Sequence, residues 1–82
     1  MNGTLADIIG LMGSALFIAA FLYSNMTQAM NFVLFNILNL IGAALLIVSL
    51  SVHFNLAAMV MEICWAVIAS YGLVKALRRR RA

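Results

Sequence analysis

The sequence has no proline and very few residues of the kinds that carry chemistry. Its 82 residues include one cysteine, one histidine and two acidic residues, Asp7 and Glu62. A single cysteine excludes an internal disulfide, and one His with one Cys does not make a metal-ligand set. These residues also cannot form a nucleophile–base pair at this spacing. The sequence therefore predicts no metal, no cofactor and no enzymatic activity.

Charge is also scarce, and it is unevenly placed. Only 9% of the residues are charged and 67% are hydrophobic, whereas a water-soluble domain of this size needs far more polar surface. Glu62 is the only charged residue between Asp7 and Lys75. The net charge of +3 comes from the basic C-terminal segment, and no nucleic-acid-binding signature accompanies it. The composition predicts an integral membrane protein.

Three apolar segments, at about residues 5–23, 30–52 and 55–75, are separated by short polar breaks. Each is close to the 20 residues that cross a bilayer as a helix. Because lipid offers no hydrogen bonds to the backbone, each span is expected to be helical. The sequence thus predicts a single all-α domain over residues 1–82, a bundle of three transmembrane helices with a basic tail at 75–82.

The basic tail also predicts the orientation. Lys75 and the arginines at 78–81 follow the third span directly, and basic residues beside a span favour the cytoplasmic side. We therefore expect a multi-pass protein whose C-terminus is in the cytoplasm and whose N-terminus is outside. Anionic lipid headgroups are candidate partners of Arg78, Arg79, Arg80 and Arg81.

Each predicted span has one face of small or polar residues and one face of large apolar residues, which is typical of helices that pack together in lipid. In the first span the small or polar face holds Gly3, Asp7, Gly10, Ser14, Phe17 and Phe21. In the second it holds Phe32, Phe35, Asn36, Asn39, Gly42, Ala43, Leu46 and Ser49. In the third it holds Asn55, Ala58, Met59, Glu62, Trp65, Ala66, Ala69 and Leu73.

Glu62 is the main candidate functional residue. It lies about 5 Å from the centre of the third span, judged by the rise of a helix, where an ionised carboxylate is costly unless it is paired, hydrated or protonated. One interpretation is a proton-carrying or cation-binding carboxyl that lines a pathway. The other is a hydrogen-bonded glutamate that locks helix packing or a dimer seam.

Four further residues are candidate members of the site. Asn39 lies near the depth of Glu62, so it either binds a hydroxylated or zwitterionic solute or joins helices by hydrogen bonds. Asn36 is expected mainly to join helices. Trp65 either stacks on a substrate or packs. Asp7 either gates the outer mouth of the pathway or is an ordinary acid at a helix start.

The order and spacing of several short motifs resemble the SemiSWEET transporters, the half-size bacterial members of the PQ-loop superfamily. The motifs are Ile9-Gly10, Ile41-Gly42 and Asn55-Leu56, with Glu62 at the position of a substrate-facing Asn. The resemblance implies a homodimer around a central pathway, a location in the bacterial inner membrane, and a third helix that lies between the first two. The family's Pro-Gln pair is absent here.

The chain is also similar to a group of uncharacterised small bacterial three-helix membrane proteins. That similarity rests on residues 7–10, 39–43 and 68–73, together with Glu62 and Trp65. It implies the same fold and no particular activity.

Two functional hypotheses follow. In the first, the protein is a half-size transporter that works as a homodimer and moves a small polar or cationic solute past Glu62 and Asn39, with proton coupling as an open question. In the second, it is a structural or accessory subunit of a larger membrane complex, and Glu62 pairs with a partner's side chain.

Overall fold

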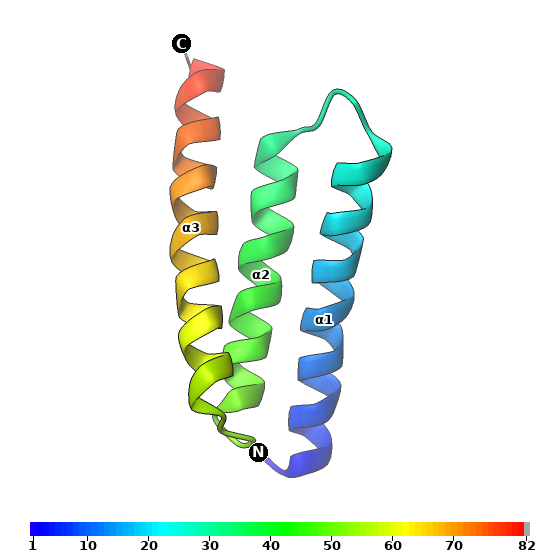
Figure 1. Ribbon diagram of the computed structural model, residues 1–82, viewed down its shortest axis with the longest axis vertical. Coiled ribbons are helices and arrows are strands. Elements are labelled where there is room, and N and C mark those ends of the chain that lie inside the picture. The colour runs from blue at the N-terminus through cyan, green and yellow to red at the C-terminus, as the bar shows by residue number, and fades with distance from the viewer. Residues whose placement is uncertain (82) are drawn as a thin grey trace.

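The computed structural model describes the backbone of residues 1–81 and the side chains of residues 1–79 (Figure 1). Three helices make up this part of the chain: α1 (Gly3–Met26), α2 (Phe32–Leu50) and α3 (Leu56–Arg81). They contain 24, 19 and 26 residues, which corresponds to about 36, 28 and 39 Å of helix. Each is long and apolar enough to cross a membrane. The predicted all-α fold with three candidate membrane spans is therefore confirmed.

The helix ends differ from the predicted ones. The basic segment from Lys75 continues α3 as far as Arg81, because Lys, Ala, Leu and Arg are all strong helix formers. The predicted separate tail is therefore part of a helix over its described length, and Ala82 lies outside the described residues. At α2 the helix begins at Phe32 rather than near residue 30 and ends at Leu50.

An asparagine precedes each helix and caps it. Asn2 Oδ1 accepts a hydrogen bond from the Leu5 amide at 2.7 Å, and Asn31 Oδ1 accepts from the first amides of α2. Asn55 Oδ1 accepts from the Ala58 amide at 3.1 Å. Asparagine is among the best N-cap residues because its side-chain oxygen satisfies amides that the helix leaves unpaired. These caps therefore determine the residue at which each helix begins after the polar segment that precedes it.

The middle helix of the bundle is α2, which packs against both α1 and α3, whereas the backbones of α1 and α3 do not approach each other (Figure 1). The arrangement implied by the SemiSWEET resemblance, with the third helix in the middle, is therefore wrong for this structure. Short connections make sequential helices antiparallel neighbours, and both α1–α2 and α2–α3 follow that rule here.

Small residues bring α1 and α2 close together. A Cβ placed on Gly13 would lie 2.8 Å from the carbonyl oxygen of Gly42, and Ala6 and Ala20 are fully buried on the same stripe. The packing face predicted for the first span was thus partly wrong, because Phe21 is 72% exposed and Asp7 is exposed. The stripe follows the smallest residues, since these allow the closest backbone approach.

The predicted faces of α2 and α3 are confirmed at their centres. Asn39, Gly42, Ala43 and Ser49 are buried on α2, and Glu62 and Ala69 are buried on α3. The opposite sides of the same helices are exposed and apolar, including Ile37 and Ile41 on α2 and Ile63 and Val67 on α3. These outer surfaces suit contact with lipid.

Candidate functional site

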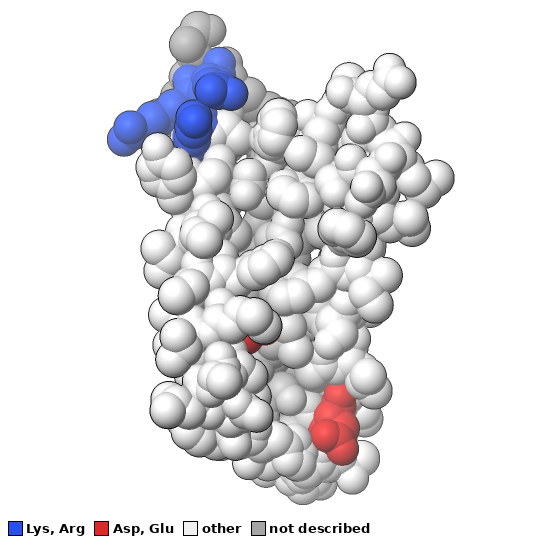
Figure 2. Space-filling model, in the orientation of Figure 1, with Lys and Arg blue, Asp and Glu red and all other residues white. Residues whose placement is uncertain are grey.

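Glu62 lies inside the bundle. Only 6% of its surface is exposed, and the space-filling view accordingly shows very little acidic surface near the middle of the molecule (Figure 2). Carboxyl oxygen Oε1 is buried and has no hydrogen-bond partner in the described part of the chain. A buried polar atom without a partner is rare and costs about 1–3 kcal/mol. This carboxyl is therefore the most unusual polar group of the structure.

The register of the helices places small residues at the level of Glu62. Trp65 bonds to Asn39 across the antiparallel α2–α3 pair, so Glu62, one turn before Trp65, is level with the segment one turn after Asn39. That segment contains Gly42 and Ala43, both buried. Small side chains there leave room for a glutamate between the helices.

Asn39 and Trp65 form a direct polar link between α2 and α3. The indole Nε1 of Trp65 donates to Asn39 Oδ1 at 3.0 Å, and Asn39 Nδ2 donates to the carbonyl oxygen of Phe35 at 2.9 Å. Both ends of the Asn39 carboxamide are thereby held in place. The predicted site residues Asn39 and Trp65 are thus brought together, one turn from Glu62.

Phe17 completes this group from α1. Its ring lies 5.3 Å from the Trp65 ring, centroid to centroid, at a 35° tilt, and it covers Gly42, where an added Cβ would lie 2.7 Å from Phe17 Cδ1. The sequence placed Phe17 on a packing face but gave no sign of its pairing with Trp65. We call Glu62, Asn39, Trp65, Phe17 and Gly42 the Glu62 site.

A shallow cavity of about 150 Å³ lies beside the Glu62 site. It is walled mainly by apolar side chains, with the carboxamides of Asn36 and Asn39 and the Trp65 ring among its lining residues. Trp65 is 44% exposed, so one part of its ring stays open beside the cavity while the rest packs on protein. The indole can therefore pack and still present surface to a solute.

Asn36 serves α2–α3 packing. Its Nδ2 donates to the carbonyl oxygen of Phe32 at 2.8 Å, and its side chain fills the space beside Gly72, where an added Cβ would lie 2.5 Å from Asn36 Oδ1. Only glycine leaves this space to the asparagine. Asn36 is two turns of α3 away from Trp65 in register, toward the C-terminal end.

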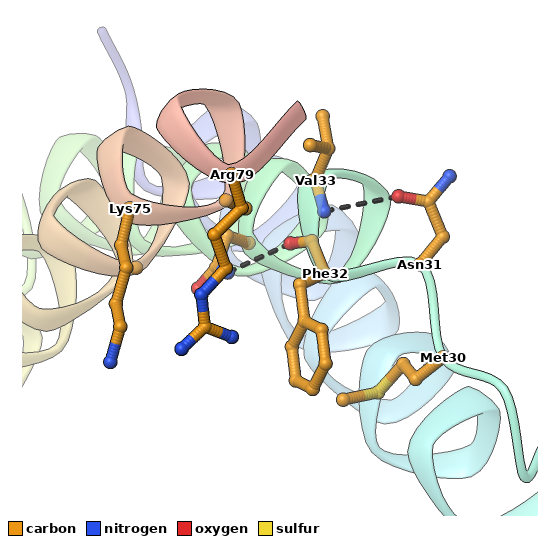
Figure 3. Close-up of a pocket in the computed structure, with 9 residues that line it drawn as sticks. Met30, Asn31, Phe32, Val33, Lys75 and Arg79 are labelled. Atoms are coloured by element: carbon orange, nitrogen blue, oxygen red, sulfur yellow. Dashed lines mark hydrogen bonds between the residues drawn. The ribbon is translucent and has the colours of Figure 1, made fainter. Parts of the chain in front are cut away.

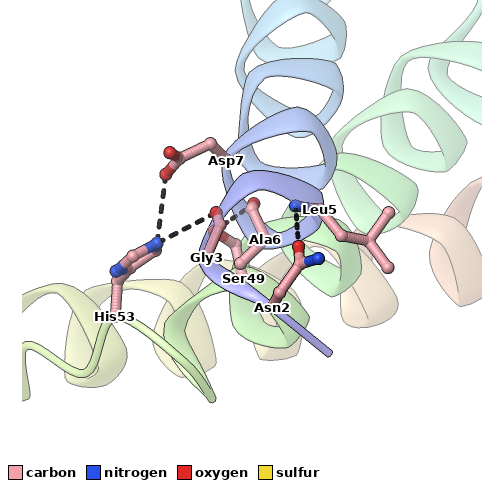
Figure 4. A network of polar contacts seen from close by, with 7 residues as sticks. All are labelled: Asn2, Gly3, Leu5, Ala6, Asp7, Ser49 and His53. Atoms are coloured by element: carbon pink, nitrogen blue, oxygen red, sulfur yellow. Dashed lines mark hydrogen bonds and ion pairs between the residues drawn. The ribbon is translucent and has the colours of Figure 1, made fainter.

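Asp7 is paired elsewhere, at the start of α1. Its Oδ1 lies 3.1 Å from Nε2 of His53, and the same nitrogen lies 3.3 Å from the carbonyl oxygen of Gly3 (Figure 4). Nearby, the Ser49 hydroxyl donates to the Ala6 carbonyl at 2.8 Å. His53 thereby links α1 to the turn between α2 and α3. Asp7 is not part of the Glu62 site.

The remaining reactive side chain, Cys64, is exposed on the outer side of α3. Within the described residues, no three His, Cys, Asp or Glu side chains form a group that could hold a metal ion.

A family model for a group of proteins with no assigned function matches residues 6–81. The chain belongs to that family. No curated protein and no solved structure matches the chain. The match covers α2, α3 and α1 from Ala6 onward, and it includes every residue of the Glu62 site.

Proposed function

We propose that the protein is a half-size membrane transporter that works as a homodimer in the bacterial inner membrane. In this proposal α1, α2 and α3 cross the bilayer with the N-terminus outside and the C-terminus in the cytoplasm. A small polar solute passes a central pathway lined by Glu62 and Asn39, and the Glu62 carboxyl carries a proton. The protein has no enzymatic step.

One observation carries the proposal: a buried carboxyl near the middle of a span with no hydrogen-bond partner on Oε1. Ionisable residues inside membrane spans are costly and mark ion or proton pathways more often than packing. A glutamate kept only for packing is expected to have its oxygens satisfied, because an unsatisfied buried oxygen weakens the fold. The unpaired oxygen of Glu62 lowers the stability of the fold, and a functional role explains why the residue is present despite this cost.

The enclosure of Glu62 suggests how a proton is coupled to the solute. Glu62 is 6% exposed, and the register of the helices places the small residues Gly42 and Ala43 at its level. Release of the proton then requires water or a cation to reach the carboxyl. A second conformation that opens the Glu62 site to one side of the membrane supplies that access.

Asn39, Trp65 and Phe17 are suited to holding the solute beside Glu62. The hydrogen bonds at both ends of Asn39 fix its carboxamide, and the open part of the Trp65 ring lies at the adjacent cavity. Aromatic and amide groups together suit a small solute that has both polar and apolar surface. A cavity of about 150 Å³ in one copy is small, which favours a pathway completed by a second copy.

The proposal is tested in proteoliposomes that contain the purified full chain and a trapped pH-sensitive dye. Small sugars, amino acids and amines are added outside one at a time, and proton movement is recorded. The expected result is that one class of solute drives proton flux, that Glu62→Gln abolishes this flux, and that the variant retains native helicity and thermal stability. The glutamine removes the proton-carrying group while keeping its size.

Asp7→Asn is the matched control, because it removes the other carboxyl of the chain without touching the Glu62 site. It is expected to retain solute-driven flux. Flux that persists in Glu62→Gln contradicts the coupling role, and a variant that no longer folds or assembles favours the packing interpretation of Glu62.

The alternative function, an accessory subunit of a larger complex, is favoured by the position of α2 in the middle of the bundle, which departs from the transporter family that the sequence resembles. Against it stands the burial of Glu62. Oε1 of Glu62 is already buried by the chain's own atoms, so a partner's Arg or Lys reaches that oxygen only if these atoms move aside. Co-purification with an unrelated membrane protein in fixed ratio would favour the alternative.

A further inference from the structure

A groove of about 690 Å³ lies at the opposite end of the bundle from His53, between the start of α2 and the last turns of α3. Its apolar wall comes from Met30, Phe32 and Val33, and its basic side chains are Lys75 and Arg79 (Figure 3). The groove exists because the α3 surface between them is made of small residues, Gly72 and Ala76. A groove of this size holds a lipid headgroup together with the upper part of an acyl chain.

Lys75 and Arg79 are four residues apart, so they lie on one face of α3. In Figure 3 both side chains and the Phe32 ring project to the same side of the helices. Two like charges at this spacing repel each other and destabilise the helix slightly unless an anion lies between them. The side chains of Lys75 and Arg79 thus form a pair of cations beside the Phe32 ring, and we call this pair the cationic clamp.

Neither acidic side chain of the protein can neutralise this clamp. Asp7 is paired with His53 at the far end of the bundle, and Glu62 is 13 residues before Lys75 on α3, which is about 20 Å along the helix. The blue patch of Lys and Arg in Figure 2 accordingly has no red atoms near it. The charge of the groove calls for an external anion.

The position along α3 indicates which anion. Counted from Leu56, about 20 residues of helix cross the hydrocarbon of a bilayer, and they end at Lys75. If the helices span a membrane, the apolar part of the groove lies at acyl-chain depth and the two cations lie at the level of the headgroup phosphates. Asn31 already caps the first amides of α2, so the direct phosphate partners are the side chains of Lys75 and Arg79.

We propose that this groove is a binding site for one anionic phospholipid, with the phosphate held by Lys75 and Arg79 and an acyl chain against Phe32 and Val33. The site differs from a general attraction between lipid and the whole run of four arginines. Arg78 carries the same charge one residue away but does not line the groove, and the side chains of Arg80 and Arg81 lie outside the described residues. The inference does not depend on the transport function.

The test uses the purified full chain in a neutral detergent, with native mass spectrometry of bound lipid. Phosphatidylglycerol is compared with phosphatidylcholine of the same acyl chains. We expect one phosphatidylglycerol per protomer in preference to phosphatidylcholine. Arg79→Gln and Lys75→Gln should each lower its affinity about fivefold, since each basic residue near a membrane surface contributes about that factor. Arg78→Gln, the matched control, should lower it less than twofold.

A second variant tests the groove without changing charge. Ala76→Leu fills the floor of the groove and is expected to lower phosphatidylglycerol binding at least fivefold, whereas Ala57→Leu, on an exposed part of the same helix, should leave binding unchanged. Equal loss in Arg78→Gln and Arg79→Gln would overturn the proposal in favour of diffuse attraction. Unchanged phosphatidylglycerol binding in Ala76→Leu would overturn the proposal. So would a variant that keeps its lipid but no longer forms a dimer, because the groove would then be occupied by a second copy of the chain.

Discussion

Glu62 and Trp65 are one helical turn apart on α3, yet their surroundings differ sharply. Trp65 has a hydrogen-bond acceptor in Asn39 and an aromatic neighbour in Phe17, whereas Oε1 of Glu62 has no partner among the described residues. Packing accounts for the position of Trp65, although part of its ring stays open, whereas packing does not account for the presence of Glu62.

The hydrogen bond from Trp65 gives a prediction about stability. Trp65→Phe removes the indole donor and leaves Asn39 Oδ1 without it in a part-buried position, so we expect a loss of about 1–2 kcal/mol, at the upper end of hydrogen bonds between membrane helices. Reversible unfolding in bilayer discs measures this. Tyr71→Phe, which removes a polar group from an aromatic that is 70% exposed on the same helix, is the control with no expected change. Equal stability of Trp65→Phe and the parent chain would show that the bond contributes nothing.

Much of the site was predictable at the residue scale, because Glu62, Asn39 and Trp65 stand out in apolar runs and helical spacing places them on inner faces. The pairings were not predictable. Asp7 and His53 both belong to the same end of the bundle by sequence, but only the packing of α1 on the turn after α2 brings them to 3.1 Å. The contact of Phe17 with Trp65 depends likewise on how closely α1 approaches α2.

At the scale of the helices, the close approach of α1 and α2 depends on glycine. A Cβ on Gly42 would lie 2.7 Å from the Phe17 ring and 3.1 Å from the carbonyl oxygen of Gly13. The ring can turn away, but the Gly13 backbone belongs to the facing helix and moves only if the two helices separate.

Gly42→Val is therefore expected to destabilise the bundle by about 1–3 kcal/mol, the usual range for overpacking, and to weaken the Phe17–Trp65 contact. Thermal unfolding followed by circular dichroism measures the first effect, and Trp65 fluorescence measures the second. Ala44→Val adds the same kind of bulk on an exposed part of α2 and should have little effect. If the two variants unfold alike, the helices are not held by this close approach.

The sequence predicted the existence of the three helices, whereas the order with α3 in the middle came only from the family resemblance and is wrong. Long apolar runs require helices in lipid, and this holds whatever the neighbours are. Which helix lies in the middle depends on which faces fit, and every predicted span had a small or polar face. The short connections, with Asn31 and Asn55 as caps, favour sequential neighbours, and the structure has that simpler order.

For the whole molecule, the charge distribution predicts orientation. Asp7 lies near the start of α1 beside His53, and Lys75, Arg78 and Arg79 lie near the end of α3, at the end of the bundle where Figure 2 shows the blue patch. Since basic residues stay in the cytoplasm, a green fluorescent protein fused to the C-terminus of the full chain should fluoresce in bacteria, and alkaline phosphatase fused at the same point should be inactive. Active phosphatase at this point would show the opposite orientation.

The arrangement of the helices leaves the proposed pathway incomplete in one copy. With α2 between its neighbours and the backbones of α1 and α3 apart, a single copy does not enclose a pathway across the membrane. The proposed transporter therefore requires a second copy, and the accessory-subunit alternative requires a different protein. The two functions differ most directly in what the chain assembles with.

Native mass spectrometry of the protein, released gently from its own membrane, measures that assembly. The proposed function predicts a homodimer of the full chain as the main species. A stable complex with an unrelated membrane protein, or a monomer under conditions that preserve known membrane dimers, would contradict it.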